Sequence, residues 1–298
     1  MNDAVSDVAL ADALAGPREY RVLCASPAGL HRMLCTEWGP ADSRKVALCV
    51  HGLTRNGRDF DALARALAQE GWRVVCPDMV GRGRSDWLSE PAGYELQQYV
   101  ADIVTLIARL GVEELHWVGT SMGGIIGIRL ASYARTPVRS LVLNDIGPEI
   151  ALGALTRLAG HVGRMPNFAD LAEAEAWMRV ACAPYGQLSD AQWAHLTKHS
   201  LRALDDGFEL AYDPAVAQVF GTLPPGGVQF WSAYEAVRCP VLALRGEESD
   251  VLGQATLRRM ASCGPKAETV EIPATGHAPM LMDAAQIGLV TDFLRKSL

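Results

Sequence analysis

The sequence predicts an α/β protein with a mostly parallel eight-stranded sheet, helices on both faces and a helical insertion late in the chain. Short apolar runs alternate along the chain with segments whose apolar residues recur at helical spacing. Several of the runs are apolar throughout, as strands buried on both faces of a parallel sheet are. The 298 residues are enough for one such domain with one insertion.

Eight segments have the composition and length of strands. The first two have no helix between them, which predicts an antiparallel hairpin at one edge of the sheet. The expected strands are Tyr20–Ala25, His31–Trp38, Val46–Val50, Arg73–Cys76, Leu115–Gly119, Ser140–Asn144, Val241–Arg245 and Glu268–Ile272.

The helical pattern is clearest over Leu96–Leu110, where six apolar residues recur at spacings of three and four. Asp59–Ala68, Met122–Tyr133 and Asp283–Leu294 have similar patterns. Between residues 148 and 237 the strand pattern stops, and Ala-rich, helix-like segments take its place. We therefore expect a core formed by residues 1–147 and 238–298, and a helical lid formed by residues 148–237.

Composition excludes several classes of protein. The formal net charge of -7 is spread without acidic or basic blocks, which argues against nucleic-acid binding. No apolar stretch is long enough for a membrane span, and residues 1–16 lack the pattern of a signal peptide. Seven cysteines without a CxxC pair suit a reducing compartment, so a cytoplasmic location is expected. Monomer and homodimer both remain open.

Ser121 is the candidate nucleophile. It lies in Gly119-Thr-Ser-Met-Gly123, directly after an expected strand and before an expected helix, which is the context of a G-x-S-x-G nucleophile elbow. The two glycines remove side chains that would collide with the neighbouring strand and helix in so tight a turn. The helix N-terminus directs free N–H groups toward developing negative charge.

A serine nucleophile needs a base and an acid that orients the base. His277 follows the last expected strand, so it opens at the same sheet edge as Ser121, and it is the candidate base. Asp250, in the loop after the preceding strand, is the chosen acid. Glu247 and Glu248 are alternatives in the same loop, and Asp145 is a further alternative, because some hydrolases take the acid from the strand before.

Two backbone N–H groups are needed to stabilise an oxyanion. Met122, directly after the nucleophile, should supply one. The loop after the third strand, His51-Gly52-Leu53, should supply the other from Leu53. His51 is interpreted as a residue that shapes this loop rather than as a second base.

These residues together resemble the α/β-hydrolase superfamily, and the resemblance covers nearly the whole chain from about Tyr20. It includes residues 77–86, which are similar to the family's D-x-x-G-x-G-x-S loop, a structural element beside the oxyanion hole. A closer resemblance is to bacterial serine carboxylesterases that carry HGLTRN, GTSMGG and SDVL, some of which act on polyesters or hydroxyacid oligomers. Serine rather than aspartate at position 121 separates the chain from haloalkane dehalogenases and epoxide hydrolases.

The resemblance implies a serine hydrolase that cleaves carboxylic esters, without a metal or organic cofactor. His195 and His199 stand four apart, as two ligands on a helix would, but the sequence offers no third ligand for a metal. A substrate with a hydrophobic part is expected, because large apolar residues are frequent in the insertion. Those that could line its pocket are Met165, Trp177, Met178, Tyr185, Phe208, Tyr212, Phe220, Trp231 and Tyr234.

Other functions use the same three residues. A carbon–carbon bond hydrolase of ring-cleavage products is one alternative, and haloperoxidase-like or lactonase activity is another. A slow-turnover ligand-binding sensor on the same fold is an alternative from a different class. Sensors of this kind often lack one element of the site, whereas every element is present here.

Overall fold

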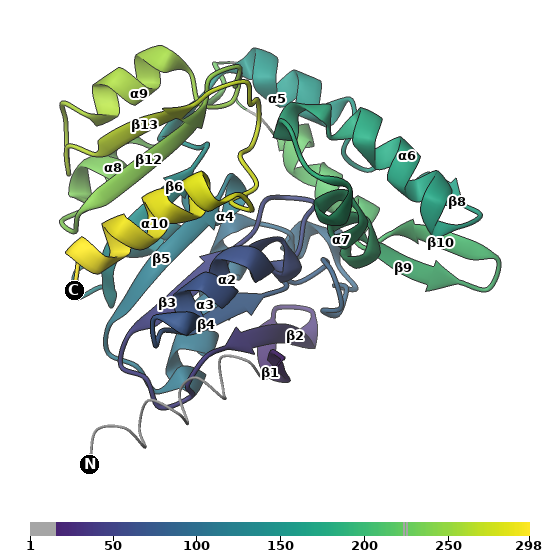
Figure 1. The fold of residues 1–298 in the computed structure, drawn as a ribbon, viewed down its shortest axis with the longest axis horizontal. Helices are drawn as coiled ribbons and strands as arrows, with labels where there is room; N and C mark the ends of the chain where they lie inside the picture. Colours follow the sequence, from purple (N-terminus) through teal and green to yellow (C-terminus); the bar gives the residue numbers. More distant parts are fainter. Residues whose placement is uncertain (1–15, 223, 225) are drawn as a thin grey trace.

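A computed structural model describes residues 16–222, 224 and 226–298, so the first fifteen residues of the expected core lie outside the described part. All eight expected strands are present, and they form one sheet in the order β1-β2-β4-β3-β5-β6-β12-β13 (Figure 1). The predicted fold class is therefore confirmed. The strands are β1 (Arg18–Ser26), β2 (Gly29–Trp38), β3 (Val46–Val50), β4 (Arg73–Pro77), β5 (Leu115–Thr120), β6 (Val138–Asn144), β12 (Val241–Gly246) and β13 (Glu268–Ile272).

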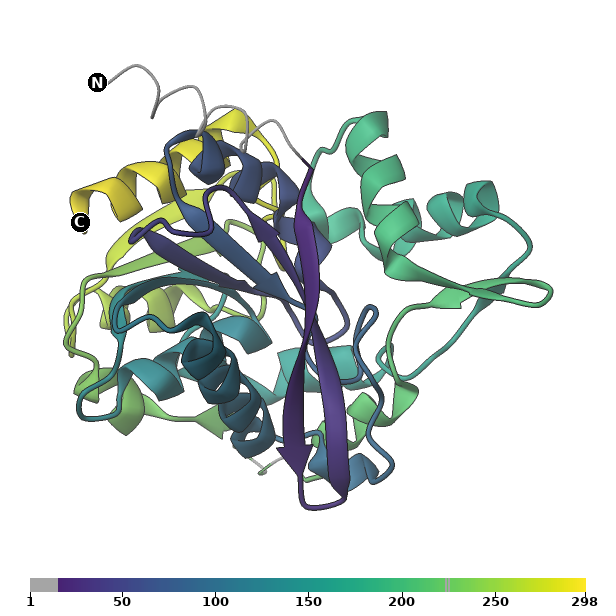
Figure 2. The ribbon, with the colours of Figure 1, turned by 90° about the horizontal axis from the view of Figure 1, so that it is seen from below.

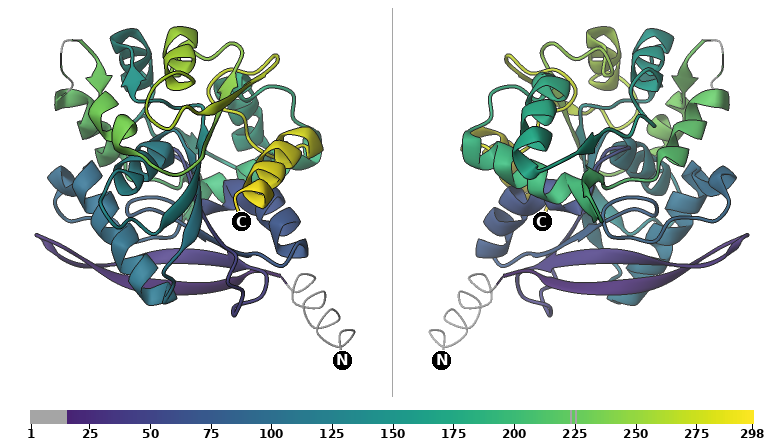
Figure 3. Two further views of the ribbon diagram at one scale, coloured as in Figure 1. Left: turned by 90° about the vertical axis from the view of Figure 1, so that its left-hand side faces the viewer. Right: turned by 90° about the vertical axis from the view of Figure 1, so that its right-hand side faces the viewer.

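The two ends of the sheet differ in strand direction. β1 and β2 form the expected antiparallel hairpin, and β2 also pairs antiparallel with β4. From β4 to β13 all neighbours are parallel. The hairpin forms a long arm at one edge of the molecule (Figure 3). The carboxyl ends of β3, β5, β6, β12 and β13 consequently share one edge of the sheet.

Two separate apolar cores cover the two faces of the sheet. Successive residues of β3 divide between them: Leu48 belongs to the first core and Cys49 to the second, as the alternation of side chains along a strand requires. α3 (Leu96–Leu110), α4 (Met122–Ala131), α8 (Trp231–Ala236) and α9 (Gln254–Met260) pack in the first core. α2 (Asp61–Gln69) and α10 (Ala284–Lys296) pack in the second.

The expected helix boundaries need small corrections. α3 has the expected bounds and ends at Gly111, whose φ of 65° provides a left-handed C-cap. The segment predicted as Asp59–Ala68 begins instead with a 3₁₀ turn, η1 (Gly57–Phe60), before α2. α4 ends two residues earlier than expected. Short 3₁₀ turns also occur at η2 (Pro91–Gly93), η3 (Ala183–Tyr185) and η4 (Pro214–Thr222).

The segment between β6 and β12 is not wholly helical, contrary to the prediction. It contains α5 (Leu152–Ala159), α6 (Leu171–Ala181), α7 (Asp190–Ser200) and α8, together with two small antiparallel sheets. One of these sheets ends in the hairpin β9–β10, which projects away from the core (Figure 2). The short strands are β7 (Glu149–Ile150), β8 (Asn167–Phe168), β9 (Leu201–Leu204), β10 (Gly207–Leu210) and β11 (Val228–Gln229).

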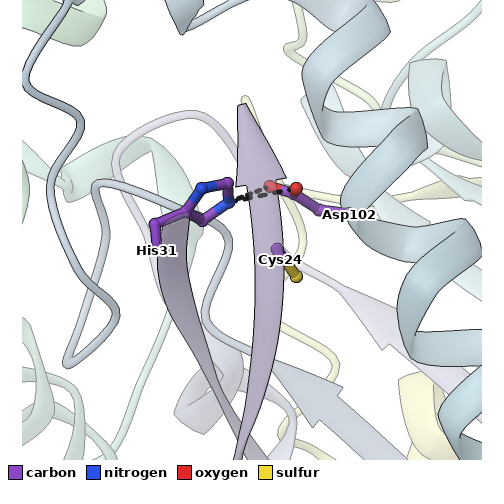
Figure 4. A group of neighbouring side chains, drawn as sticks. All are labelled: Cys24, His31 and Asp102. Carbon is purple, nitrogen blue, oxygen red and sulfur yellow. Dashed lines mark hydrogen bonds and ion pairs between the residues drawn. The ribbon is translucent and has the colours of Figure 1, made fainter. Parts of the chain in front are cut away.

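A buried histidine–aspartate contact fixes the β1–β2 hairpin to α3. The His31 imidazole Nε2 lies 3.0 Å from both carboxylate oxygens of Asp102 (Figure 4). Gln98 donates to the same carboxylate. Burial raises the Asp102 pKa, and the contact with His31 opposes that rise. The nearby Cys24 thiol has a pKa raised to about 12, chiefly by burial, so it stays protonated at neutral pH. We interpret this group as a structural pair with a buried thiol beside it.

Cysteines in the described part are free, and four of the seven are buried, as expected of small apolar residues in strands. Among the described residues no helix has the length and apolar character needed to cross a membrane.

Candidate active site

Ser121 occupies the turn between β5 and α4. Its backbone has φ 50° and ψ -116°, a conformation that residues with a side chain rarely adopt. Its N–H donates to the carbonyl oxygen of Asn144 at 3.0 Å, which ties the turn to the end of β6. The tight turn places Ser121 beyond the carboxyl edge of the sheet, as the sequence predicted.

The glycines of the elbow are required by close backbone contacts. A Cβ atom on Gly123 would lie 2.0 Å from the Val50 carbonyl oxygen, and one on Gly119 would lie 2.4 Å from the Gly123 backbone. No side-chain rotation relieves contacts with backbone atoms. The pattern G-x-S-x-G thus follows from the packing of β3 and β5 against α4.

We expect Gly123→Ala to lower the free energy of unfolding by about 2–4 kcal/mol, because β3 and α4 must separate to admit the methyl group. Gly153→Ala, on α5, is the matched control: nothing lies within 4 Å of the added Cβ, and alanine favours a helix, so a gain of about 0.5 kcal/mol is expected. Urea unfolding of both variants measures the difference. Equal stability of the two would contradict the packing argument.

Ser121, His277 and Asp145 form a hydrogen-bonded chain. His277 Nε2 lies 3.0 Å from the Ser121 hydroxyl oxygen, and His277 Nδ1 lies 2.6 Å from a carboxylate oxygen of Asp145. A neutral imidazole that donates from Nδ1 to the carboxylate has its Nε2 lone pair facing the serine hydroxyl. The structure therefore brings the predicted nucleophile and base together, in the arrangement that activates a serine.

Asp145 is held rigidly at the end of β6. It is completely buried, and its carboxylate accepts hydrogen bonds from the Gly246 N–H at 2.9 Å and the Ser249 hydroxyl at 2.6 Å. Its φ of 54° lies in the left-handed region, like that of Ser121. Both donors come from the end of β12 and the loop after it, so that loop supports Asp145.

The choice of Asp250 as the acid is wrong for this structure. The Asp250 carboxylate accepts two hydrogen bonds of 2.6 Å from the Arg157 guanidinium on α5, which lowers the Asp250 pKa. In the loop after β12, Ser249 is the residue that turns inward to Asp145, and the following residue is exposed. Glu247, in the same loop, accepts from the Ala274 N–H instead of contacting His277.

The loop after β3 lies against the nucleophile. A Cβ atom on Gly52 would be 3.6 Å from the Ser121 Cβ, and Leu53 lines the same cavity as Ser121. Met122 begins α4, and the first N–H groups of a helix have no acceptor within it. The placement of Leu53 and Met122 suits the oxyanion role expected of them, which stays a prediction.

One buried arginine, not predicted from the sequence, contacts both expected oxyanion residues. Arg82 donates from Nε to the Leu53 carbonyl oxygen at 2.7 Å, and its Nη2 lies 3.6 Å from the Met122 sulfur. Its guanidinium also lies 4.8 Å from the centre of the Tyr99 ring. The signal in the sequence was the position of Arg82 between Gly81 and Gly83, in a segment that we interpreted only as a structural element beside the oxyanion hole.

His51 shapes the loop, as interpreted from the sequence. It is fully buried, with Nδ1 2.7 Å from the Gly52 carbonyl oxygen, and its Nε2 accepts the Met79 N–H. Burial lowers the His51 pKa to about 3, assisted by the nearby Arg82. The ring is thus neutral at neutral pH and makes both contacts at once.

Two spaces at the site share lining residues, and Ser121 lines the smaller of them. An inner cavity of about 90 Å³ is lined by Leu53, Phe60, Ser121 and His277 among others. An outer cleft of about 900 Å³ is lined in part by residues of α5 and α6. Residues that line both are Thr54, Arg55, Leu158, Val162, Tyr185 and His277.

Only some of the expected apolar residues line these spaces. Five of the nine do so: Met165, Trp177, Met178, Tyr185 and Tyr212. Trp231 and Tyr234 belong to the core on the first face of the sheet, where the Tyr234 hydroxyl donates to the Met260 carbonyl oxygen. Sequence alone could not separate the two groups, because both consist of large apolar residues in the insertion.

The histidine pair on α7 does have a third neighbour. Asp61 lies near His195 and His199, with ligand atoms of all three within 4.8 Å of one another. The Asp61 carboxylate, however, already accepts hydrogen bonds from Arg58 Nε at 2.8 and 2.9 Å. Burial, and next the Arg58 charge, lower the His199 pKa to about 4. The cationic surroundings disfavour a metal ion, and we assign none.

Comparison with known proteins agrees with the fold. Residues 46–284 match the family model described as alpha/beta hydrolase fold. A 3-hydroxybutyrate-oligomer hydrolase from Cupriavidus necator is 45% identical over 94% of this chain and 98% of its own length. A solved alpha/beta hydrolase from Novosphingobium aromaticivorans is 35% identical, with a TM-score of 0.84 over 95% of this chain and 99% of its own.

A second solved structure, of a putative hydrolase from Rickettsia typhi, has a TM-score of 0.86 at 29% identity, over 95% of this chain and 99% of that one. The family match spans most of the chain, and the relative from Cupriavidus necator is similar from end to end. The chain is a hydrolase that belongs to the alpha/beta hydrolase fold family.

Proposed function

We propose that the chain is a serine esterase that hydrolyses oligomers of short hydroxyacids through an acyl-enzyme intermediate. The observation that carries this proposal is the hydrogen-bonded chain Asp145–His277–Ser121 at the junction of the inner cavity and the outer cleft. The relative from Cupriavidus necator, named for 3-hydroxybutyrate oligomers, supports the substrate class. Such oligomers are chains of esters with a hydroxyl group at one end and a carboxylate at the other.

In the first half of the reaction, the Ser121 hydroxyl oxygen attacks the ester carbonyl carbon, and His277 Nε2 takes the hydroxyl proton. The Leu53 and Met122 N–H groups stabilise the resulting oxyanion. The carbon–oxygen bond to the alcohol then breaks, and His277 returns the proton to the leaving oxygen. The buried Asp145 carboxylate stabilises the imidazolium during these steps.

In the second half, water attacks the acyl-serine carbonyl carbon and gives its proton to His277. The tetrahedral intermediate collapses, the acid leaves, and Ser121 recovers the proton from His277. Ser121, His277, the ester and water account for every bond formed and broken, and the proposed cycle uses no metal or organic cofactor.

We propose that residues 148–237 form a lid over the site. α5 and α6 supply much of the lining of the outer cleft, and the Arg157–Asp250 ion pair ties α5 to the loop after β12. The same loop holds Asp145 through Ser249, so it contacts both the proposed lid and the proposed acid.

The experiment that tests the function is hydrolysis of the 3-hydroxybutyrate trimer and of p-nitrophenyl esters from acetate to decanoate. We expect monomer and dimer from the trimer, with kcat on the order of 1–10³ s⁻¹. A fluorophosphonate should label the protein once, with the added mass on the peptide that contains Ser121. Turnover of a vinylogous diketone without turnover of any ester would favour the carbon–carbon hydrolase instead. Binding without turnover would favour the sensor.

A further inference from the structure

The outer cleft has an unusual charge for this protein. Arg55, Arg157 and Arg164 line it, together with His161 and His277, and no Asp or Glu does so among the described residues. The whole chain, in contrast, has a formal net charge of -7. A cationic cleft in an acidic protein favours a substrate that carries negative charge.

Two of the three arginines are already neutralised by partners. Arg55 Nε donates to Asp59 at 2.8 Å, and Arg55 also holds the Ser200 hydroxyl at 2.7 Å. Arg157 forms the double hydrogen bond with Asp250. Each pair contributes little net charge to the cleft, so an anion is attracted less strongly to these two guanidinium groups than to an unpaired one.

Arg164 is different. It follows α5, is exposed, and makes no ion pair or side-chain hydrogen bond within the part of the chain that the structure describes. The neighbouring His161 is exposed as well. A guanidinium has five N–H donors in a planar fork that matches a carboxylate. Arg164 is therefore the cation of the cleft that remains available for a ligand.

We propose that Arg164 binds the free carboxylate of the oligomer, so that the enzyme recognises its substrate from the carboxyl end. This inference rests on the proposed function. The inner cavity of about 90 Å³ at Ser121 has room for a short acyl unit, whereas the outer cleft of about 900 Å³ has room for the remainder. The half of the substrate that leaves as the alcohol carries the free carboxylate. In the outer cleft this carboxylate binds the Arg164 guanidinium.

The test compares the 3-hydroxybutyrate trimer as free acid with its methyl ester, which has the same scissile bonds and no charge. We expect Arg164→Gln to lower kcat/KM for the free acid by about 3–10-fold, mainly through KM, as expected for one exposed charge pair. The methyl ester should change by less than about 2-fold. Arg164→Lys keeps the charge but loses the planar guanidinium, so its kcat/KM for the free acid should lie between those of the wild type and Arg164→Gln. Added salt should reduce the preference of the wild type for the free acid over the methyl ester.

Arg44→Gln is the matched control. Arg44 is also exposed, but it precedes β3 at the opposite edge of the sheet from Ser121, so both substrates should be unaffected. Equal loss on acid and methyl ester in Arg164→Gln, or no loss on either, overturns the carboxylate proposal while leaving the esterase intact. Absence of ester turnover in the wild type would instead overturn the proposed function itself.

Discussion

Ser121→Ala is expected to lower kcat for p-nitrophenyl butyrate by about 10⁵–10⁶-fold, the scale of loss when the nucleophile of a serine triad is removed. In the proposed mechanism the Ser121 hydroxyl oxygen forms the acyl-enzyme, and its proton goes to His277 Nε2, which lies 3.0 Å away. Alanine has neither this oxygen nor this proton. KM should change little, because the methyl group leaves the cavity walls in place. Steady-state assays at high enzyme concentration, with fluorophosphonate labelling, measure both effects.

Ser132→Ala serves as the control for this substitution. Ser132 is the C-cap of α4, and its hydroxyl donates only to the Arg129 carbonyl oxygen in the same turn. We expect full activity and full labelling. Residual activity of Ser121→Ala above about 1% of the wild type would place the nucleophile elsewhere, since loss of a nucleophile leaves only binding and oxyanion contributions.

The core of the fold was predictable because its strands are parallel and buried. A strand buried on both faces must be apolar at every position, so its ends are visible where the apolar run stops. β3 accordingly has the predicted bounds, Val46–Val50. β13 also has its predicted bounds, Glu268–Ile272, although three of its five residues are exposed, and its β-branched residues are what indicate a strand. The insertion was less predictable because β8 and β9, with two and four residues, are too short to show alternation. Their pairing depends on contacts distant in sequence.

The places of Ser121 and His277 were predictable because each follows a local pattern in the sequence. Gly119 and Gly123 are required by backbone contacts, and His277 follows the last parallel strand. The acid has no such signature, because β6 and β12 are neighbours and both end near an aspartate. Asp145 directly follows its strand, whereas Asp250 comes four residues after Gly246, in a loop whose path the sequence does not specify.

Asp145→Asn is expected to lower kcat by about 10³–10⁴-fold, with KM nearly unchanged. The amide can donate to His277 Nδ1, which favours the tautomer whose Nε2 carries the proton and cannot act as a base. It also removes the charge that stabilises the imidazolium. Asp250→Asn, the matched control, should retain kcat within about 3-fold, because it breaks only an exposed pair with Arg157.

The two substitutions are chemically identical and lie in neighbouring loops, so their comparison isolates the acid. Loss of kcat in Asp145→Asn alone agrees with the 2.6 Å contact to His277. A large loss in Asp250→Asn, with Asp145→Asn active, would mean that Asp250 leaves Arg157 and reaches His277 during turnover. In that case Arg157→Gln, which frees the Asp250 carboxylate, should raise activity. With Asp145 as the acid, Arg157→Gln should only loosen the attachment of α5. Its kcat should then stay within about 3-fold of the wild type, as expected for Asp250→Asn.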